Sequence, residues 1–131
     1  MNRESRSLMR RIVIIDDSGD DAEALTRALN AYGAHDVHWF DEPTDLSTLG
    51  LDEHGLVILD LILGNHTDGL KVLEQMAALG LKQTPIFLVS GVMSNLLQVA
   101  ESYGRAHGLS IVGSVEKPVC PSEIIKVLPL T

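Results

Sequence analysis

The stretch Ile12-Val13-Ile14-Ile15-Asp16-Asp17 decides the fold of this 131-residue chain. Its four consecutive β-branched residues predict a strand that is buried on both faces, and two carboxylates follow that strand directly. A second apolar run with the same kind of ending, Leu56-Val57-Ile58-Leu59-Asp60, lies further along the chain. Strands of this kind are typical of a parallel sheet that helices cover on both faces.

The remaining strands and helices alternate along the chain. Apolar runs rich in β-branched residues predict three further strands, over 37–40, 85–89 and 109–112. Apolar residues at three- and four-residue spacing predict helices over 22–32, 70–77 and 96–103. Weaker patterns predict short helices over 44–50 and 121–128.

Five strand–helix units in alternation predict an α/β fold, a doubly wound, flavodoxin-like parallel sheet with right-handed crossovers. We expect five strands in the order 2-1-3-4-5 and five helices. The chain is too short for an eight-stranded barrel, and a hydrophobic fraction of 45% is enough for one core. We therefore expect one domain over 10–131, preceded by a flexible leader over 1–9.

The charge and cysteine content exclude several classes of partner. Eighteen acidic residues stand against ten basic ones, and the net charge of −8 repels a phosphate backbone, so direct nucleic-acid binding is not expected. The single cysteine, Cys120, cannot form an internal disulfide. No apolar run reaches the length of a membrane helix. We expect a cytoplasmic protein with no membrane contact.

Polar residues follow the predicted strands at the edge where parallel sheets bind ligands. Asp16 and Asp17 follow the first strand, Asp60 the third, Ser90 the fourth and Lys117 the fifth. Taken singly, most of these residues are ordinary helix caps or turn residues. Asp60 differs because it interrupts the most apolar run, where a charge needs a partner. Taken together, the five indicate a site.

The clustered carboxylates predict phosphoryl transfer that depends on a metal. Asp16, Asp17 and Asp60 repel one another unless a divalent cation neutralises them, and oxygen ligands favour Mg²⁺. Asp60 is the expected nucleophile and would become an acyl phosphate. Lys117 would place a positive charge on the phosphoryl oxygens, and Ser90 would supply a hydroxyl.

On these residues the chain closely resembles the receiver domain of two-component response regulators. The matching stretches cover 10–128: Ile12–Asp17 (IVIIDD), Leu56–Asp60 (LVILD), Asp68-Gly69-Leu70, Val89-Ser90-Gly91 and Glu116-Lys117-Pro118. The resemblance implies that Asp60 accepts a phosphoryl group from a sensor histidine kinase or a phosphotransfer protein. It also implies that the chain is no enzyme beyond its own phosphorylation and dephosphorylation.

The resemblance further implies a role for each site residue. Asp17 would ligate Mg²⁺ directly, Asp16 largely through water, and Ile62 through its backbone carbonyl. Ser90 and Lys117 would contact the phosphoryl group, and the peptide bond that follows Lys117 would be cis. Phosphorylation would then bias a two-state equilibrium in the face formed by the fourth helix, the fifth strand and the fifth helix, which would also serve a homodimer.

The chain departs from the family's pattern around the site. The loop after Asp60 lacks the usual proline and is one residue longer. Ser114 stands where an aromatic residue is usual, which puts the usual Ser/Thr–aromatic switch in doubt. Ile62 and Val92 are apolar where many receivers have polar groups, so we expect a long-lived aspartyl phosphate.

The short last helix suggests a truncated chain or one that continues into another domain. The segment 108–118 is similar to that of receivers fused to EAL-type cyclic-di-GMP phosphodiesterases, which makes such an output domain, C-terminal or separate, an expected partner.

Three other functions stay open. A degenerate receiver that acts as a phosphorylation-independent scaffold is supported by the longer loop and Ser114. An aspartate-nucleophile phosphatase of the haloacid dehalogenase class needs an Asp-x-Asp pair after the first strand, whereas Asp16 and Asp17 are adjacent. An FMN-binding flavodoxin needs a Ser/Thr/Gly-rich phosphate loop there, which the sequence lacks. Outside the site, we interpret Trp39 and Phe40 as packing between helix and sheet.

Overall fold

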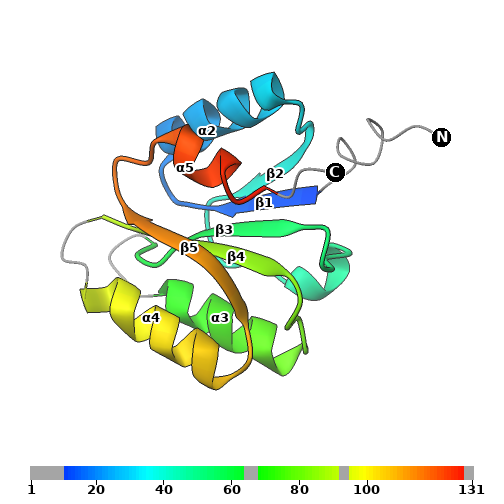
Figure 1. The fold of residues 1–131 in the computed structure, drawn as a ribbon, viewed down its shortest axis with the longest axis vertical. Helices are drawn as coiled ribbons and strands as arrows, with labels where there is room; N and C mark the ends of the chain where they lie inside the picture. Colours follow the sequence, from blue (N-terminus) through cyan, green and yellow to red (C-terminus); the bar gives the residue numbers. More distant parts are fainter. Residues whose placement is uncertain (1–10, 64–67, 92–94, 129–131) are drawn as a thin grey trace.

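The computed structural model describes residues 11–63, 68–91 and 95–128. These residues contain a five-stranded parallel sheet in the order β2-β1-β3-β4-β5, which confirms the predicted topology (Figure 1). The strands are β1 (Arg11–Ile15), β2 (Asp36–Phe40), β3 (Leu56–Asp60), β4 (Pro85–Ser90) and β5 (Ser110–Glu116). The predicted leader over 1–9 lies outside the described residues.

Helices cover both faces of the sheet. The described residues form α2 (Gly19–Tyr32), α3 (Asp68–Ala78), α4 (Asn95–Ala106) and α5 (Pro121–Ile125). In Figure 1, α3 and α4 lie on one face of the sheet and α2 and α5 lie on the other. No helix in the described part of the chain is long and apolar enough to cross a membrane.

The prediction of a helix over 44–50, which made up the count of five, was wrong. This segment forms only a 3₁₀ turn, η1 (Leu46–Thr48). The side chain of Asp45 accepts hydrogen bonds from the backbone N–H of Ser47, at 3.0 Å, and from its hydroxyl, at 2.6 Å. Short polar side chains that bond to the nearby backbone favour turns over helices, so the segment stops after one turn.

The last helix is shorter than the predicted range of 121–128. After Ile125 the chain continues in tighter turns, in which Val127 N donates to Ile124 O at 3.0 Å and Leu128 N to Ile125 O at 3.1 Å. Ile124 and Leu128 are both buried. The segment therefore still covers the sheet beyond the end of α5.

The core consists of two apolar layers, one on each side of the sheet. Val13 and Ile15 of β1 belong to the layer beneath α3 and α4, whereas Ile12 and Ile14 belong to the layer beneath α2 and α5. β1 and β3 pair in register with Ile15 opposite Leu59. Because of this pairing, Asp16, which follows Ile15, and Asp60, which follows Leu59, lie side by side at one edge of the sheet.

Gly69 brings the start of α3 close to the end of β3. A Cβ atom at this position would lie 2.5 Å from the carbonyl oxygen of Asp60 and 2.5 Å from Leu61 Cα, closer than real Cβ contacts allow. The backbone N–H of Gly69 donates to Leu61 O at 3.2 Å. A side chain here would push α3 away from Asp60.

Candidate functional site

Three carboxylates meet at the carboxyl ends of β1 and β3. Asp16 and Asp17 follow β1, and Asp60 is the last residue of β3. One carboxylate oxygen of each lies within 4.8 Å of the others. Asp16 and Asp60 are buried, and Asp17 is exposed. The structure thus brings together the three carboxylates that the sequence places at the strand ends.

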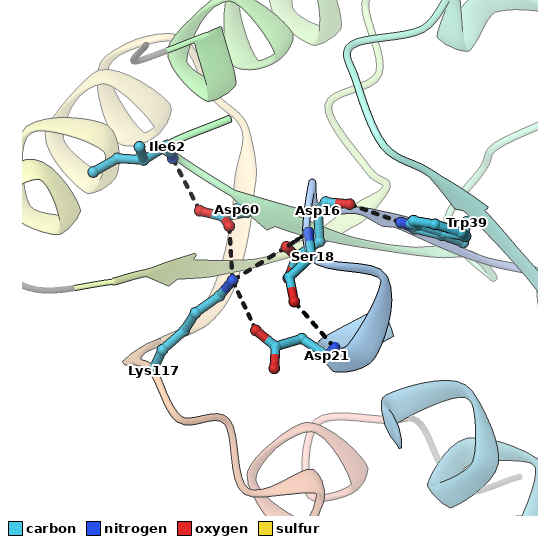
Figure 2. Close-up of polar contacts among 7 residues, drawn as sticks. All are labelled: Asp16, Ser18, Asp21, Trp39, Asp60, Ile62 and Lys117. Carbon is cyan, nitrogen blue, oxygen red and sulfur yellow. Dashed lines mark hydrogen bonds and ion pairs between the residues drawn. The ribbon is translucent and has the colours of Figure 1, made fainter. Parts of the chain in front are cut away.

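Lys117 reaches this cluster from the loop after β5. Its Nζ lies 3.0 Å from Asp60 Oδ2, 3.1 Å from Asp16 Oδ1 and 3.1 Å from Asp21 Oδ2 (Figure 2). Its backbone N–H donates to Ser90 O at 2.7 Å, and the Lys117–Pro118 peptide bond is cis, as the resemblance implies. The ammonium group is therefore anchored among carboxylates from three different segments.

Asp21 is the site residue that sequence reasoning missed. It lies in the first turn of α2, where its backbone N–H donates to the N-cap side chain of Ser18 at 3.2 Å. Acidic residues are common in first turns because they interact favourably with the helix dipole. The sequence alone therefore carries no signal that separates Asp21 from its neighbour Asp20.

Asp60 lies in surroundings that disfavour its charge. Its side chain is only 3% exposed, and burial is the main cause that raises its pKa to about 6. The N–H of Ile62, which donates to Asp60 Oδ1 at 2.9 Å, and the ammonium of Lys117 act in the opposite direction, while the charge of Asp16 adds to the rise. A cation that enters the site would favour the ionised form.

The site as a whole carries excess negative charge. Burial opposes the charge of Lys117, but its pairing with Asp60, Asp21 and Asp16 outweighs burial and raises its pKa, so it stays protonated at neutral pH. One ammonium faces these three carboxylates and the nearby Asp17. An all-oxygen donor set with unbalanced negative charge fits a hard divalent cation such as Mg²⁺.

Ser90 carries a buried hydroxyl at the end of β4, the strand that pairs with the end of β3. Val89 is the partner of Asp60 in the β3–β4 register, and Ser90 comes next. Its Oγ is fully buried and has no hydrogen-bond partner among the described residues. A buried unpaired hydroxyl costs about 1–3 kcal/mol, which an incoming acceptor oxygen would offset.

The remaining predictions around the site concern Ile62, Val92, the loop after Asp60 and Ser114. The main-chain N–H of Ile62 bonds to Asp60, while the role of its carbonyl as a metal ligand stays a prediction. Val92 and the loop over 64–67 lie outside the described residues. The hydroxyl of Ser114 donates to Glu101 Oε2 at 2.5 Å and so joins β5 to α4.

The prediction that Trp39 packs between helix and sheet holds only in part, since its ring lies beside Gly19 of α2 but stays largely open to solvent. β2 is an edge strand, and Trp39 on it is 45% exposed. Its indole Nε1 donates instead to the backbone oxygen of Asp16, at 2.7 Å. Phe40 is partly buried against the core, as expected.

A family model of the response regulator receiver domain matches residues 12–129. This chain belongs to the response regulator receiver family. The match includes all the strands after the start of β1 and every residue of the candidate site. Membership favours the receiver over the phosphatase and flavodoxin alternatives, which do not place their site residues in this pattern.

Solved structures of other receivers have the same fold. A response regulator from Colwellia psychrerythraea is 26% identical, with a TM-score of 0.79 over 92% of this chain and 94% of that chain. A signal receiver domain from Bermanella marisrubri is 26% identical, with a TM-score of 0.69 over 88% and 92%. A response regulator from Burkholderia pseudomallei with a phosphorylated aspartic acid, a calcium ion and citrate is 22% identical, with a TM-score of 0.70 over 92% and 66%. Comparison with curated protein sequences gave no match.

Proposed function

We propose that this receiver takes a phosphoryl group onto Asp60 from a sensor histidine kinase or a phosphotransfer protein, in a Mg²⁺-dependent reaction in the cytoplasm. The observation that carries the proposal is the buried Asp60 carboxylate, 3.0 Å from Lys117 and clustered with Asp16 and Asp17. Its own chemistry is limited to uptake and loss of the phosphoryl group. The phosphorylated aspartic acid and the calcium ion of the Burkholderia pseudomallei regulator support this assignment.

The reaction uses Asp60 as the nucleophile. A carboxylate oxygen attacks phosphorus, the bond from phosphorus to the donor's nitrogen or oxygen breaks, and the donor leaves with that electron pair. Lys117 binds a phosphoryl oxygen, and the unpaired hydroxyl of Ser90 donates to another. When Asp16, Asp17 and Asp60 hold Mg²⁺, the ion supplies positive charge beside the transferring group.

A small phosphodonor tests this function without knowledge of the kinase. With acetyl phosphate and Mg²⁺, we expect the intact mass to rise by one phosphoryl group, and the Asp60→Asn variant to show no rise. Asp41→Asn is the matched control, since Asp41 is an exposed carboxylate that follows a strand at the same edge but is outside the cluster. Equal labelling of wild type and Asp60→Asn would contradict the proposal, and no labelling of wild type would favour the scaffold.

Slow loss of the phosphoryl group is part of the proposal. Ile62 has no polar side-chain atom that could orient a water molecule, and its N–H is already bound to Asp60. Val92 is apolar as well. We expect the double variant Ile62→Asn, Val92→Glu to dephosphorylate faster, as measured by decay of the phosphorylated mass. An unchanged decay rate would contradict this explanation.

The output surface is proposed to be the face formed by α4, β5 and α5. The hydrogen bond from Ser114 to Glu101 joins two of these elements, β5 and α4. We propose that phosphorylation alters this face for a homodimer or an output domain, with the EAL type as the specific candidate. Size-exclusion chromatography with and without beryllofluoride and Mg²⁺ tests the dimer.

A further inference from the structure

Trp39 contacts the site from outside the carboxylate cluster. The indole lies at the edge of the sheet, and its N–H points to the backbone oxygen of Asp16 (Figure 2). The ring also lies beside Gly19 at the start of α2, where an added Cβ would be 3.5 Å from Trp39 Cη2. This is the single tryptophan of the chain, and nearly half of it is exposed. Core packing does not account for such a position.

Residues of β2 hold both backbone groups of Asp16. Its N–H donates to Phe40 O at 3.1 Å, and its carbonyl accepts the indole N–H at 2.7 Å. β1 and β2 pair in register as far as Ile15 opposite Phe40. The indole thus supplies a donor just beyond the end of the strand pairing, where a carbonyl otherwise bonds to water.

The side chain of Asp16 is fixed independently of Trp39. Its Oδ1 accepts the N–H of Ser18 at 2.8 Å and lies 3.1 Å from Lys117 Nζ. The carbonyl of Asp16 and the nitrogen of Asp17 belong to one planar peptide unit, so a group that holds this carbonyl also affects the backbone of Asp17. Rotation of that plane would move Asp17 relative to Asp60. The indole hydrogen bond therefore limits the direction in which Asp17 enters the cluster.

We propose that Trp39 is a positioning residue that orients the Asp16–Asp17 peptide for metal binding. The inference rests on the proposed function, because it assumes that these carboxylates hold Mg²⁺. Groups that orient metal ligands contribute measurably to metal affinity, although they do not touch the ion. Loss of one such hydrogen bond predicts a dissociation constant for Mg²⁺ that is about three- to tenfold higher.

Two replacements remove the donor while they keep an aromatic ring. Trp39→Phe is the genetic variant. The sharper replacement is 3-benzothienylalanine, which has sulfur in place of the indole N–H and otherwise the same shape. Since the chain has one tryptophan, incorporation of this amino acid in place of tryptophan changes position 39 alone. Tyr32→Phe is the matched control, an exposed aromatic residue at the far end of α2.

Mg²⁺ binding is measured by titration calorimetry without a phosphodonor. We expect both replacements to raise the dissociation constant about three- to tenfold, and Tyr32→Phe to leave it unchanged. In wild type, the fluorescence of Trp39 should change during the titration, with the midpoint at the calorimetric dissociation constant. Thermal unfolding distinguishes a packing role from a positioning role. If the ring only packs, its loss lowers the midpoint of unfolding equally with and without Mg²⁺. If Trp39 positions the metal ligands, its loss also reduces the rise in the midpoint that Mg²⁺ produces.

The outcomes distinguish this inference from the function on which it rests. If wild type binds Mg²⁺ and the benzothienyl protein binds it equally well, the positioning role is overturned and the proposed function stands. The same holds if only Trp39→Phe binds more weakly, since ring contact would then be the cause. Wild type that binds no Mg²⁺ would overturn both.

Discussion

Two carboxylates at opposite ends of the sheet have similar cationic partners and opposite pKa shifts. Asp36 begins β2, and its Oδ2 lies 2.9 Å from Arg11 Nε while its Oδ1 lies 2.6 Å from His38 Nε2. Asp60 ends β3, and its Oδ2 lies 3.0 Å from Lys117 Nζ. The pKa of Asp36 is lowered, whereas that of Asp60 is raised to about 6.

The extent of burial explains the difference. Burial is the largest single cause at both carboxyl groups, and at both it raises the pKa. The Asp36 side chain is 32% exposed, and its bonds with Arg11 and His38 together outweigh burial. The Asp60 side chain is 3% exposed, and burial prevails over Lys117. The partners of Asp36 thus stabilise its charged form, whereas the charged form of Asp60 would be stabilised by an added cation.

Removal of the cationic side chain at each end of the sheet should give the largest difference in stability between the two ends. Lys117→Met leaves the buried carboxylates of Asp60 and Asp16 without an ammonium group, so we expect the free energy of unfolding to fall by about 3 kcal/mol at pH 8. Arg11→Met should cost only about 1 kcal/mol, because Asp36 stays partly hydrated. Urea denaturation measures both. Equal losses of unfolding free energy in the two variants would show that the difference in burial does not affect stability.

The pH dependence of stability should differ in sign between the two carboxyl groups. The pKa of Asp60 is about 6 in the folded protein against an ordinary 3.8, so between these values the folded state binds more protons than the unfolded state. Its contribution to the free energy of unfolding therefore falls by about 2–3 kcal/mol as pH rises from about 4 to about 6. The lowered pKa of Asp36 gives stability that is lost as pH falls below about 4.

Urea denaturation at a series of pH values checks these signs. Asp60→Asn should remove the fall between about pH 4 and pH 6, whereas Asp36→Asn should leave it and weaken the loss below about pH 4. If Asp60→Asn and wild type had the same profile between these pH values, the environment of Asp60 would not disfavour its charge.

Added Mg²⁺ should stabilise one end of the sheet and not the other. At neutral pH we expect the free energy of unfolding to rise by about 1.4 kcal/mol for each tenfold excess of Mg²⁺ over its dissociation constant. Asp17→Asn should lose this rise, whereas Asp36→Asn should keep it. Thermal unfolding across a MgCl₂ series, with ionic strength held constant by NaCl, makes the measurement. An equal rise in Asp17→Asn would point to general salt effects instead.

The smallest expected effect concerns Asp21, which shares Lys117 with Asp60. Asp21→Asn removes a competing partner of Lys117 and one charge that repels an anionic phosphodonor. We expect acetyl phosphate to label Asp60 about threefold faster, because one charge at this range contributes less than about 1 kcal/mol in a hydrated site. Asp20→Asn, the exposed neighbour, changes the net charge equally and is the control. An equal acceleration in both variants would indicate net charge alone.

Most of the fold could be predicted from local patterns. The apolar runs of β1 and β3 are continuous because both faces of those strands are buried, and the residues that follow them mark one edge of a parallel sheet. The segment over 44–50 was mispredicted because a proline and a weak pattern resemble a helix start, while Asp45 bonds locally and ends the turn. The exposure of Trp39 could not be predicted, since nothing in the sequence shows how open an edge strand is.

The sequence by itself determined the order of the strands and the family. It also singled out the candidate site residues Asp16, Asp17, Asp60, Ser90 and Lys117, because each of them is tied to a strand end. Only the tertiary structure decided that Asp21 pairs with Lys117 and that Trp39 holds the carbonyl of Asp16. It also decided that Asp60 is buried deeply enough for its pKa to rise. These features depend on distances between segments far apart in the chain and on the exclusion of water, which no local pattern of residues encodes.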